Sequence, residues 1–419
     1  MTQPASAPYV LAFTGQNANG ILDWWTAQIL HGFARHGLRH RIIDVEDKDW
    51  RTRLADTLIA GNPAFCFSFQ GFGMDLRLEG RNYWSINRIP FLSYLGDSPY
   101  HNPALHNAEG EGLYLLYGCA DFLDTYRRHL HGRAFATTLR YGYPENPNAD
   151  AAPWAGRDLG ILYVKSGVDP AQLAAGWTGL PTRIRAILHE AADAALAGAD
   201  DAIADLCAAA FERSSIHCGD RRELFLFVCS TVDRYVRAVR ADRMVRGLMH
   251  HDATIIGDWS HLDRAGARAR FCSPVSADVL DSLYANARIV VNTTPSVRRG
   301  IHERVMAGLF AKSAIVSDAT PFMQQTLDGC PSFFGLDIDG QDFPDRLDAT
   351  LAAAVDDGAM PDRIAASFAT ARRLFSFDDF IQAMIDILEI ETHRRAVEPW
   401  AFPPTRLPAP QERTQLHAA

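Results

Sequence analysis

The sequence predicts an α/β protein with two doubly wound parallel sheets and a helical insertion in its second half. In both halves, short and continuously apolar segments alternate with amphipathic helical segments. This pattern is typical of parallel strands that are covered by helices on both faces. The length of 419 residues exceeds what one ordinary hydrophobic core accommodates. Two domains are therefore expected.

Residues 1–150 are expected to form the N-terminal domain. Amphipathic helices are predicted at 21–36 and 50–60, between apolar strands at 9–14, 41–45, 64–69 and 90–95. The last of these strands runs into Gly-Asp-Ser-Pro-Tyr-His, which places Asp97 and His101 at its carboxyl end. Ligands of open α/β sheets bind at this end of the strands. The two side chains are therefore candidates for an acceptor site.

Residues 151–395 are expected to form the C-terminal domain. A strand at 158–164 ends at Lys165, and a nearly pure helical pattern over 169–248 indicates an insertion of several helices. Alternation then resumes, with strands at 288–292 and 313–317 and a last helix at 377–393. The polar, proline-rich tail 396–419 is expected to be extended or disordered. Two such domains in tandem predict a central cleft between the carboxyl ends of their sheets.

Composition excludes several classes of function. The net charge of −9 argues against general binding to nucleic acid or to an anionic membrane, so any phosphate site must be a local basic pocket. The seven cysteines are scattered without a Cys-x-x-Cys pair, which fits reduced thiols in a cytoplasmic protein and no metal site. No signal peptide and no transmembrane segment are expected.

The stretch 287–318 carries the strongest functional pattern. It predicts a buried strand, a polar loop with Arg298 and Arg299, an amphipathic helix and a second buried strand. A helix N-terminus that follows a parallel strand offers free N–H groups and a positive dipole end to an anion. Neighbouring arginines favour a phosphate or diphosphate. The alternative is a capped surface helix with exposed arginines.

Three short motifs in this region resemble those of a known family. They are Asn-Thr-Thr-Pro at 292–295, Gly-Ile-His-Glu-Arg at 300–304 and Ile-Val-Ser-Asp at 315–318. The run 271–318 resembles the nucleotide-sugar half of GT-B glycosyltransferases, in particular the group related to the spore maturation protein CgeB. Gly-Asp-Ser-Pro-Tyr-His at 96–101 is similar to a second stretch of that group. The resemblance spans most of residues 60–390.

The resemblance implies a GT-B fold with two Rossmann-like domains and a donor site in the C-terminal one. The implied donor residues are Phe271 and Ser273 near the base, Asn292 and Thr293 at a strand end, and Gly300, Ile301, His302, Glu303 and Arg304 at the diphosphate. Met306 departs from the family, because many retaining GT-B enzymes have a ribose-binding glutamate there. Glu303, one helical turn earlier, is a candidate for that role.

The expected function is transfer of a hexose from a nucleotide-diphosphate sugar, most plausibly UDP-linked, to an unidentified acceptor in a bacterial cytoplasm. Arg304 and Lys165 are expected to stabilise the leaving diphosphate, so no metal or other cofactor is required. Asp97 is the candidate base if the reaction inverts, and His101 can orient the acceptor. The resemblance favours retention. A turn-capping role for Asp97, interface packing for His101 and a surface position for Lys165 stay open.

Two alternatives to transfer also stay open. A GT-B nucleotide-sugar epimerase or hydrolase would consume the donor without an acceptor. A non-catalytic protein whose helical insertion binds a partner protein would bind no nucleotide.

Overall fold

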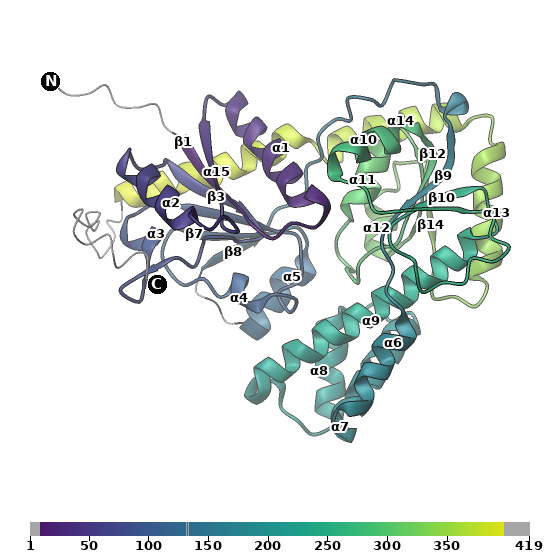
Figure 1. Ribbon diagram of the computed structural model, residues 1–419, viewed down its shortest axis with the longest axis horizontal. Helices are drawn as coiled ribbons and strands as arrows, with labels where there is room; N and C mark the ends of the chain where they lie inside the picture. Colours follow the sequence, from purple (N-terminus) through teal and green to yellow (C-terminus); the bar gives the residue numbers. More distant parts are fainter. Residues whose placement is uncertain (1–8, 131, 133, 398–419) are drawn as a thin grey trace. The chain divides into compact units, whose positions relative to one another are not determined.

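The computed structural model describes residues 9–130, 132 and 134–397, except for the side chains of residues 220 and 394–397. The chain divides into two compact units. Unit 1 comprises Met1–Gly142 and Phe377–Ala419, and unit 2 comprises Tyr143–Ser376. Each unit contains a six-stranded parallel sheet with flanking helices (Figure 1). The predicted fold class is confirmed. The predicted tail lies outside the described residues from 398 onward.

The sheet of unit 1 has the strand order β2-β1-β3-β6-β7-β8. Its strands are β1 (Tyr9–Thr14), β2 (Arg39–Asp44), β3 (Phe65–Phe69), β6 (Phe91–Leu95), β7 (Leu113–Tyr117) and β8 (Phe135–Thr138). The helices are α1 (Ile21–Arg35), α2 (Trp50–Ile59), α3 (Tyr83–Ile86), α4 (Pro103–His106), α5 (Ala120–Thr125) and α15 (Phe377–Val397), and β4 (Arg77–Leu78) pairs with β5 (Arg81–Asn82). The central strands β3, β6 and β7 are buried at every position. Both faces of this sheet are therefore covered, as their continuous apolar sequences require.

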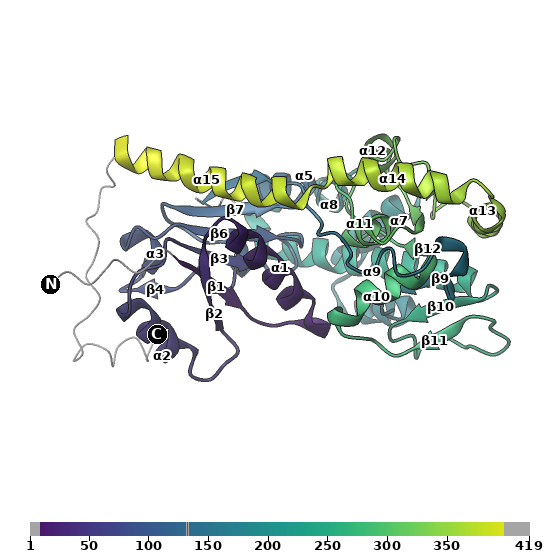
Figure 2. The same cartoon turned by 90° about the horizontal axis from the view of Figure 1, so that it is seen from above.

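The C-terminal helix α15 belongs to unit 1, whereas the predicted boundaries placed residues 151–395 together in the second domain. Figure 2 shows this helix lying lengthwise along the sheet of unit 1. Phe380 packs edge-on against Tyr94, with ring centroids 5.1 Å apart. Gly32 of α1 leaves no room for a Cβ beside Ile381. The chain thus returns to its first unit, and sequence periodicity does not reveal which unit a helix covers.

The sheet of unit 2 has the strand order β11-β10-β9-β12-β13-β14. Its strands are β9 (Leu159–Val164), β10 (Ala253–Ile256), β11 (Arg270–Cys272), β12 (Ala287–Asn292), β13 (Ala314–Asp318) and β14 (Phe333–Leu336). Flanking helices are α10 (Ala277–Asn286), α11 (Glu303–Phe310), α12 (Pro321–Thr326), α13 (Phe343–Asp356) and α14 (Met360–Leu374). All its strand pairs are parallel. The carboxyl ends of β9, β12 and β13 therefore lie side by side.

The predicted helical insertion is present between β9 and β10. It comprises α6 (Pro170–Ala175), α7 (Thr182–Leu196), α8 (Ile203–Arg213) and the 27-residue α9 (Arg222–Leu248). The last turns of α9 pack into the core of the sheet through Met244, Val245 and Leu248. Its first turns pack with α7 and α8 in a bundle that extends away from this sheet (Figure 1). One helix therefore belongs to both the sheet layer and the insertion.

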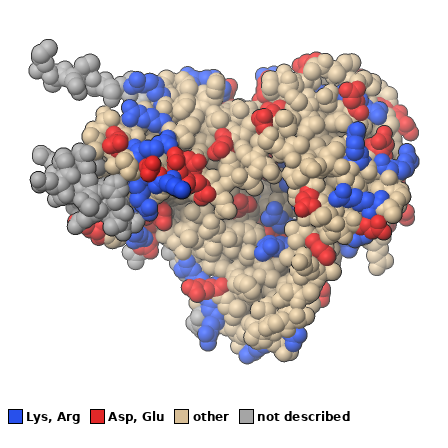
Figure 3. Space-filling view, viewed as in Figure 1, with Lys and Arg blue, Asp and Glu red and all other residues tan. Residues whose placement is uncertain are grey.

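The surface charges, the cysteines and the helices bear on the composition-based expectations. Acidic and basic side chains are interspersed on the face drawn in Figure 3. All seven cysteines are free thiols, and most of them are buried. Within residues 9–397, where the structure describes the chain, no helix is long and apolar enough to cross a membrane.

Candidate functional site

Lys165 follows directly after β9, at the carboxyl end of the central strand of unit 2. Its backbone N–H donates to the carbonyl of Ile256 (2.9 Å), and its carbonyl accepts a hydrogen bond from the indole Nε1 of Trp259 (2.7 Å). A Cβ on Gly257 would lie 2.2 Å from the same carbonyl oxygen. Gly257 and the fully buried Trp259 thus fix the position of the lysine. Sequence reasoning identified Lys165 but not these two supports.

The end of β12 supplies the next group of polar side chains. The Lys165 Nζ donates to Thr293 Oγ1 (3.0 Å), and that oxygen lies 2.7 Å from the hydroxyl of Tyr163. Asn292, which is completely buried, accepts from Arg304 Nη1 (3.2 Å). The predicted residues Lys165, Asn292, Thr293 and Arg304 therefore form one connected region.

The end of β13 closes this region on its other side. Asn292 Nδ2 donates to Ser317 Oγ (2.9 Å). Asp318 accepts from the backbone N–H of Thr294 (2.6 Å) and from its hydroxyl (2.8 Å). Burial raises the pKa of the Asp318 carboxyl, although these hydrogen bonds oppose the shift. The loop after β12 is consequently held between two strand ends.

The N-terminus of α11 follows the loop that begins at the end of β12. His302 is the N-cap residue, and its Nδ1 accepts from the N–H of Arg304 (3.2 Å). Burial and the nearby cations Arg304, Lys165 and Arg237 hold the pKa of His302 well below its ordinary value. The ring is therefore neutral at pH 7 with its proton on Nε2, which lies 3.2 Å from Glu303 Oε2. The predicted Gly300 and Ile301 lie in the irregular loop directly before this cap.

Positive charge is concentrated around Lys165. Burial, followed by the charges of Arg304 and Arg237, lowers its pKa well below the ordinary value. Arg237 belongs to α9 and forms an ion pair with the buried Asp233 one turn earlier (3.5 Å). The neighbouring positive charges disfavour the protonated form of Lys165, and a bound anion would stabilise that form. The site is therefore suited to bind a phosphate or diphosphate.

A second α9 arginine lies beside the strand ends. Arg240 makes a bidentate pair with Asp339, with Nε donating to Oδ1 (3.2 Å) and Nη2 to Oδ2 (2.6 Å), and also donates to the carbonyl of Ala195. Both charged side chains are buried. They line a small polar cavity of about 60 Å³ together with Thr294, Arg298 and Asp318. Sequence reasoning missed this pair and took the sequence to lack an Asp-x-Asp motif, which is wrong: one is present at 337–339, and Arg240 binds its second carboxylate.

Several predicted residues lie apart from this region. Phe271 is on the edge strand β11 and Ser273 follows it, so β10 separates them from β9. The ring of Phe271 packs against the guanidinium of Arg264 (4.5 Å). Met306, the position at which the family has a ribose-binding glutamate, is completely buried on α11. Sequence spacing alone does not separate such core positions from site positions.

Asp97 and His101 belong to unit 1. Asp97 follows the carboxyl end of β6, is exposed, and accepts a hydrogen bond from Gln70 Nε2 (2.8 Å). His101 packs edge-on against Tyr100 (4.9 Å between ring centroids). Gln70, in the left-handed region at φ 75°, was not identified from the sequence. Among the residues for which the structure gives positions, no group of three or more His, Cys, Asp or Glu side chains is arranged to hold a metal ion.

Comparison with known structures defines the fold as GT-B. Sucrose-phosphate synthase from Thermosynechococcus elongatus is similar over 92% of this chain and 99% of its own, with a TM-score of 0.51 and 11% identity. Anabaena Alr3699/HepE in complex with UDP-glucose is similar over 91% and 99%, with a TM-score of 0.50 and 10% identity. No family model matches the sequence, and no curated protein matches it. At these identities the likeness shows the fold alone.

Proposed function

We propose that the protein is a glycosyltransferase that uses a nucleotide-diphosphate sugar, with its donor site at the carboxyl ends of β9, β12 and β13. The observation that carries this proposal is the convergence of Lys165, Arg304 and the N-terminus of α11 in a GT-B domain. Two proteins with this fold are a sucrose-phosphate synthase and Alr3699/HepE, the latter in complex with UDP-glucose. The CgeB-like motifs at 292–304 and 315–318 support the same location.

In this proposal the diphosphate binds against the first turn of α11. The backbone of residues 300–303 and the positive end of the helix dipole face it. Lys165 and Arg304 neutralise the negative charge that develops when the glycosidic bond to the phosphate breaks. The Lys165 ammonium is already held by Thr293 and the Arg304 guanidinium by Asn292, so little reorganisation is needed during the reaction. These cations do the work that a bound metal does in other transferases.

The roles of the remaining polar groups follow from their chemistry. Neutral His302 has its Nε2–H directed to Glu303, which orients that carboxylate toward hydroxyl groups of the ribose or the transferred sugar. Retention is the favoured stereochemistry, with a phosphate oxygen of the leaving group taking the acceptor proton. Asp97 serves as general base if the reaction inverts, because its Gln70 hydrogen bond orients the carboxylate.

Calorimetric titration with UDP, ADP, GDP and UDP-glucose tests the proposal directly. Binding of at least one nucleoside diphosphate is expected, and binding of none would overturn the donor site. Mass spectrometry of the donor, incubated with and without an acceptor mixture, then separates the classes of reaction. Turnover without an acceptor would indicate a hydrolase or epimerase instead.

A further inference from the structure

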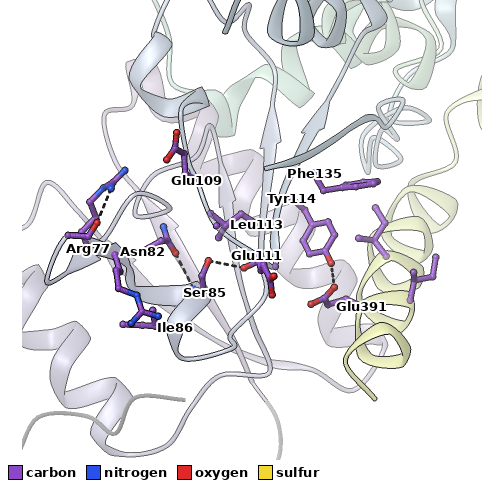
Figure 4. Close-up of a pocket in the computed structure, with 16 residues that line it drawn as sticks. Arg77, Asn82, Ser85, Ile86, Glu109, Glu111, Leu113, Tyr114, Phe135 and Glu391 are labelled. Carbon is purple, nitrogen blue, oxygen red and sulfur yellow. Dashed lines mark hydrogen bonds between the residues drawn. The ribbon is translucent and has the colours of Figure 1, made fainter. Parts of the chain in front are cut away.

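Unit 1 contains a large cavity at the amino ends of its strands. It has a volume of about 700 Å³ and is lined by the turn before β7, the first residue of β8, the β4–β5 hairpin and the last turns of α15 (Figure 4). Cavities that bind organic ligands span roughly 300 to 1,000 Å³. Asp97 follows the opposite, carboxyl end of β6. The proposed chemistry therefore does not account for this cavity.

One wall of the cavity is apolar and includes an exposed aromatic ring. Phe135 is 56% exposed and packs against the ring of Tyr114 with centroids 5.5 Å apart. Ile390 of α15 is 67% exposed and borders the same space. Figure 4 shows Tyr114 and Phe135 beside the helix, with the Tyr114 hydroxyl hydrogen-bonded to the buried carboxylate of Glu391. An exposed phenyl ring beside a fixed second ring is a platform for a flat, weakly polar surface.

The facing wall carries polar groups of both signs. Arg77 and Arg81 come from the hairpin, whereas Glu109 and Glu111 come from the turn Glu-Gly-Glu-Gly. Gly110 in that turn adopts a φ of 151°, and a Cβ there would lie 2.1 Å from Ser85 Oγ. The close approach of the turn to α3 thus depends on glycine. The wall presents two guanidinium groups and two carboxylates, so neither sign of charge dominates.

We propose that this cavity is a binding site for a neutral carbohydrate, separate from the donor site. A sugar ring has an apolar C–H face that stacks on an aromatic ring such as Phe135. Its hydroxyl groups both donate and accept, which matches a wall that mixes guanidinium groups with carboxylates. A fully charged ligand would match one sign and be repelled by the other. The volume accommodates a short oligosaccharide.

Binding of soluble oligosaccharides to the full-length protein tests this assignment. Short neutral oligomers of glucose, galactose and N-acetylglucosamine are titrated by calorimetry and by saturation-transfer NMR. At least one series is expected to bind, with affinity about tenfold lower in both Phe135→Ala and Phe135→Leu. The leucine variant keeps the apolar area and removes only the ring. It therefore separates stacking from simple hydrophobic contact.

The matched control is Phe227→Ala, because Phe227 is also an exposed phenylalanine (47%) but lies on α9 of unit 2. Oligosaccharide binding is expected to be unchanged in this variant and in Lys165→Met. If Phe135→Ala fails to fold, Glu111→Ala on the exposed turn replaces it, with the same expected loss. Absence of binding by every oligosaccharide, or full affinity in Phe135→Leu, would overturn the proposal. Binding of a fatty acid or detergent alone would assign the cavity to an apolar ligand instead.

Discussion

Replacing Lys165 by methionine separates a ligand-binding lysine from a structural one. The change removes the ammonium group and keeps most of the apolar stem. In the free protein this ammonium is desolvated beside Arg304 and Arg237, which is why its pKa is lowered. The Thr293 hydroxyl keeps its contact with Tyr163 after the substitution. Thermal stability of the free variant is therefore expected to be unchanged or higher.

The affinity of Lys165→Met for UDP should be lower than that of the wild type. A hydrogen bond to a charged group contributes about 1.5 to 3 kcal/mol. With about 1.4 kcal/mol for each factor of ten, the dissociation constant should rise roughly 10- to 150-fold. The backbone of Lys165 stays fixed by Trp259, so little of this loss comes from displacement of β9. Loss of affinity combined with retained stability is the signature of a binding residue.

Calorimetry with UDP and differential scanning calorimetry of the free proteins measure both effects. Lys312→Met is the matched control, since Lys312 precedes β13 at the opposite end of the sheet and pairs with the exposed Asp150. It should leave UDP affinity unchanged and cost less than about 1 kcal/mol of stability. The assignment is refuted if Lys165→Met binds UDP like the wild type. It is also refuted if the variant loses affinity only because it unfolds.

Three further predictions follow from buried charges. UDP binding should be accompanied by proton uptake, because the diphosphate raises the lowered pKa of Lys165. Calorimetric titrations in buffers of different ionisation enthalpy, between about pH 7 and pH 10, measure the number of protons taken up. Zero uptake at every pH would contradict this prediction. Burial lowers the pKa of His106 from 6.5 to about 3. Below pH 6.5 the unfolded state therefore binds a proton at His106 that the folded state does not, and about 2 kcal/mol of folding stability should be lost between pH 6.5 and pH 5. His106→Phe keeps an aromatic ring beside Tyr117. In urea unfolding, the stability of this variant should fall less steeply as the pH is lowered. Arg240→Met should cost about 3 kcal/mol by leaving the Asp339 carboxylate buried, and an unchanged urea midpoint would contradict the importance of the pair.

Most of the strands that sequence reasoning located have continuous apolar runs, although the located edge strand β2 is buried only at Ile43. The predicted strand at 9–14 has the observed bounds of β1, and the others differ by one or two residues at their ends. β7, β8 and β14 were not predicted. Leu113–Tyr117 is an apolar run that the pattern would have permitted, whereas the edge strand Phe135–Thr138 is largely exposed and carries no such run. Edge strands are harder to recognise because only part of their surface is buried.

The site was predictable to the extent that parallel topology determines it. Lys165, Asn292 and Arg304 follow or face strand ends, and neighbouring parallel strands bring those ends together. The contribution of α9 was not predictable in this way. Which of its many arginines face the strand ends depends on how a 27-residue helix crosses the sheet. Helical spacing places Asp233, Arg237 and Arg240 on one face but does not show what that face packs against.

The position of α9 bears on the alternative that the insertion is an independent partner-binding module. Arg240 joins α9 to the loop after β14, and Arg298, in the loop before α11, forms an ion pair with Asp200 between α7 and α8 (2.6 Å). The insertion therefore contacts the candidate donor loop through Asp200 and the loop after β14 through Arg240. A partner that shifts α7 and α8 would also shift the Arg298 loop, and any resulting coupling between nucleotide affinity and partner binding must act in both directions. Deletion of the insertion does not separate partner binding from nucleotide binding, because it also removes Arg237 and Arg240 of α9. Asp200→Asn, which releases one contact and leaves α9 intact, is the informative change: it should alter UDP affinity only if the two regions are coupled.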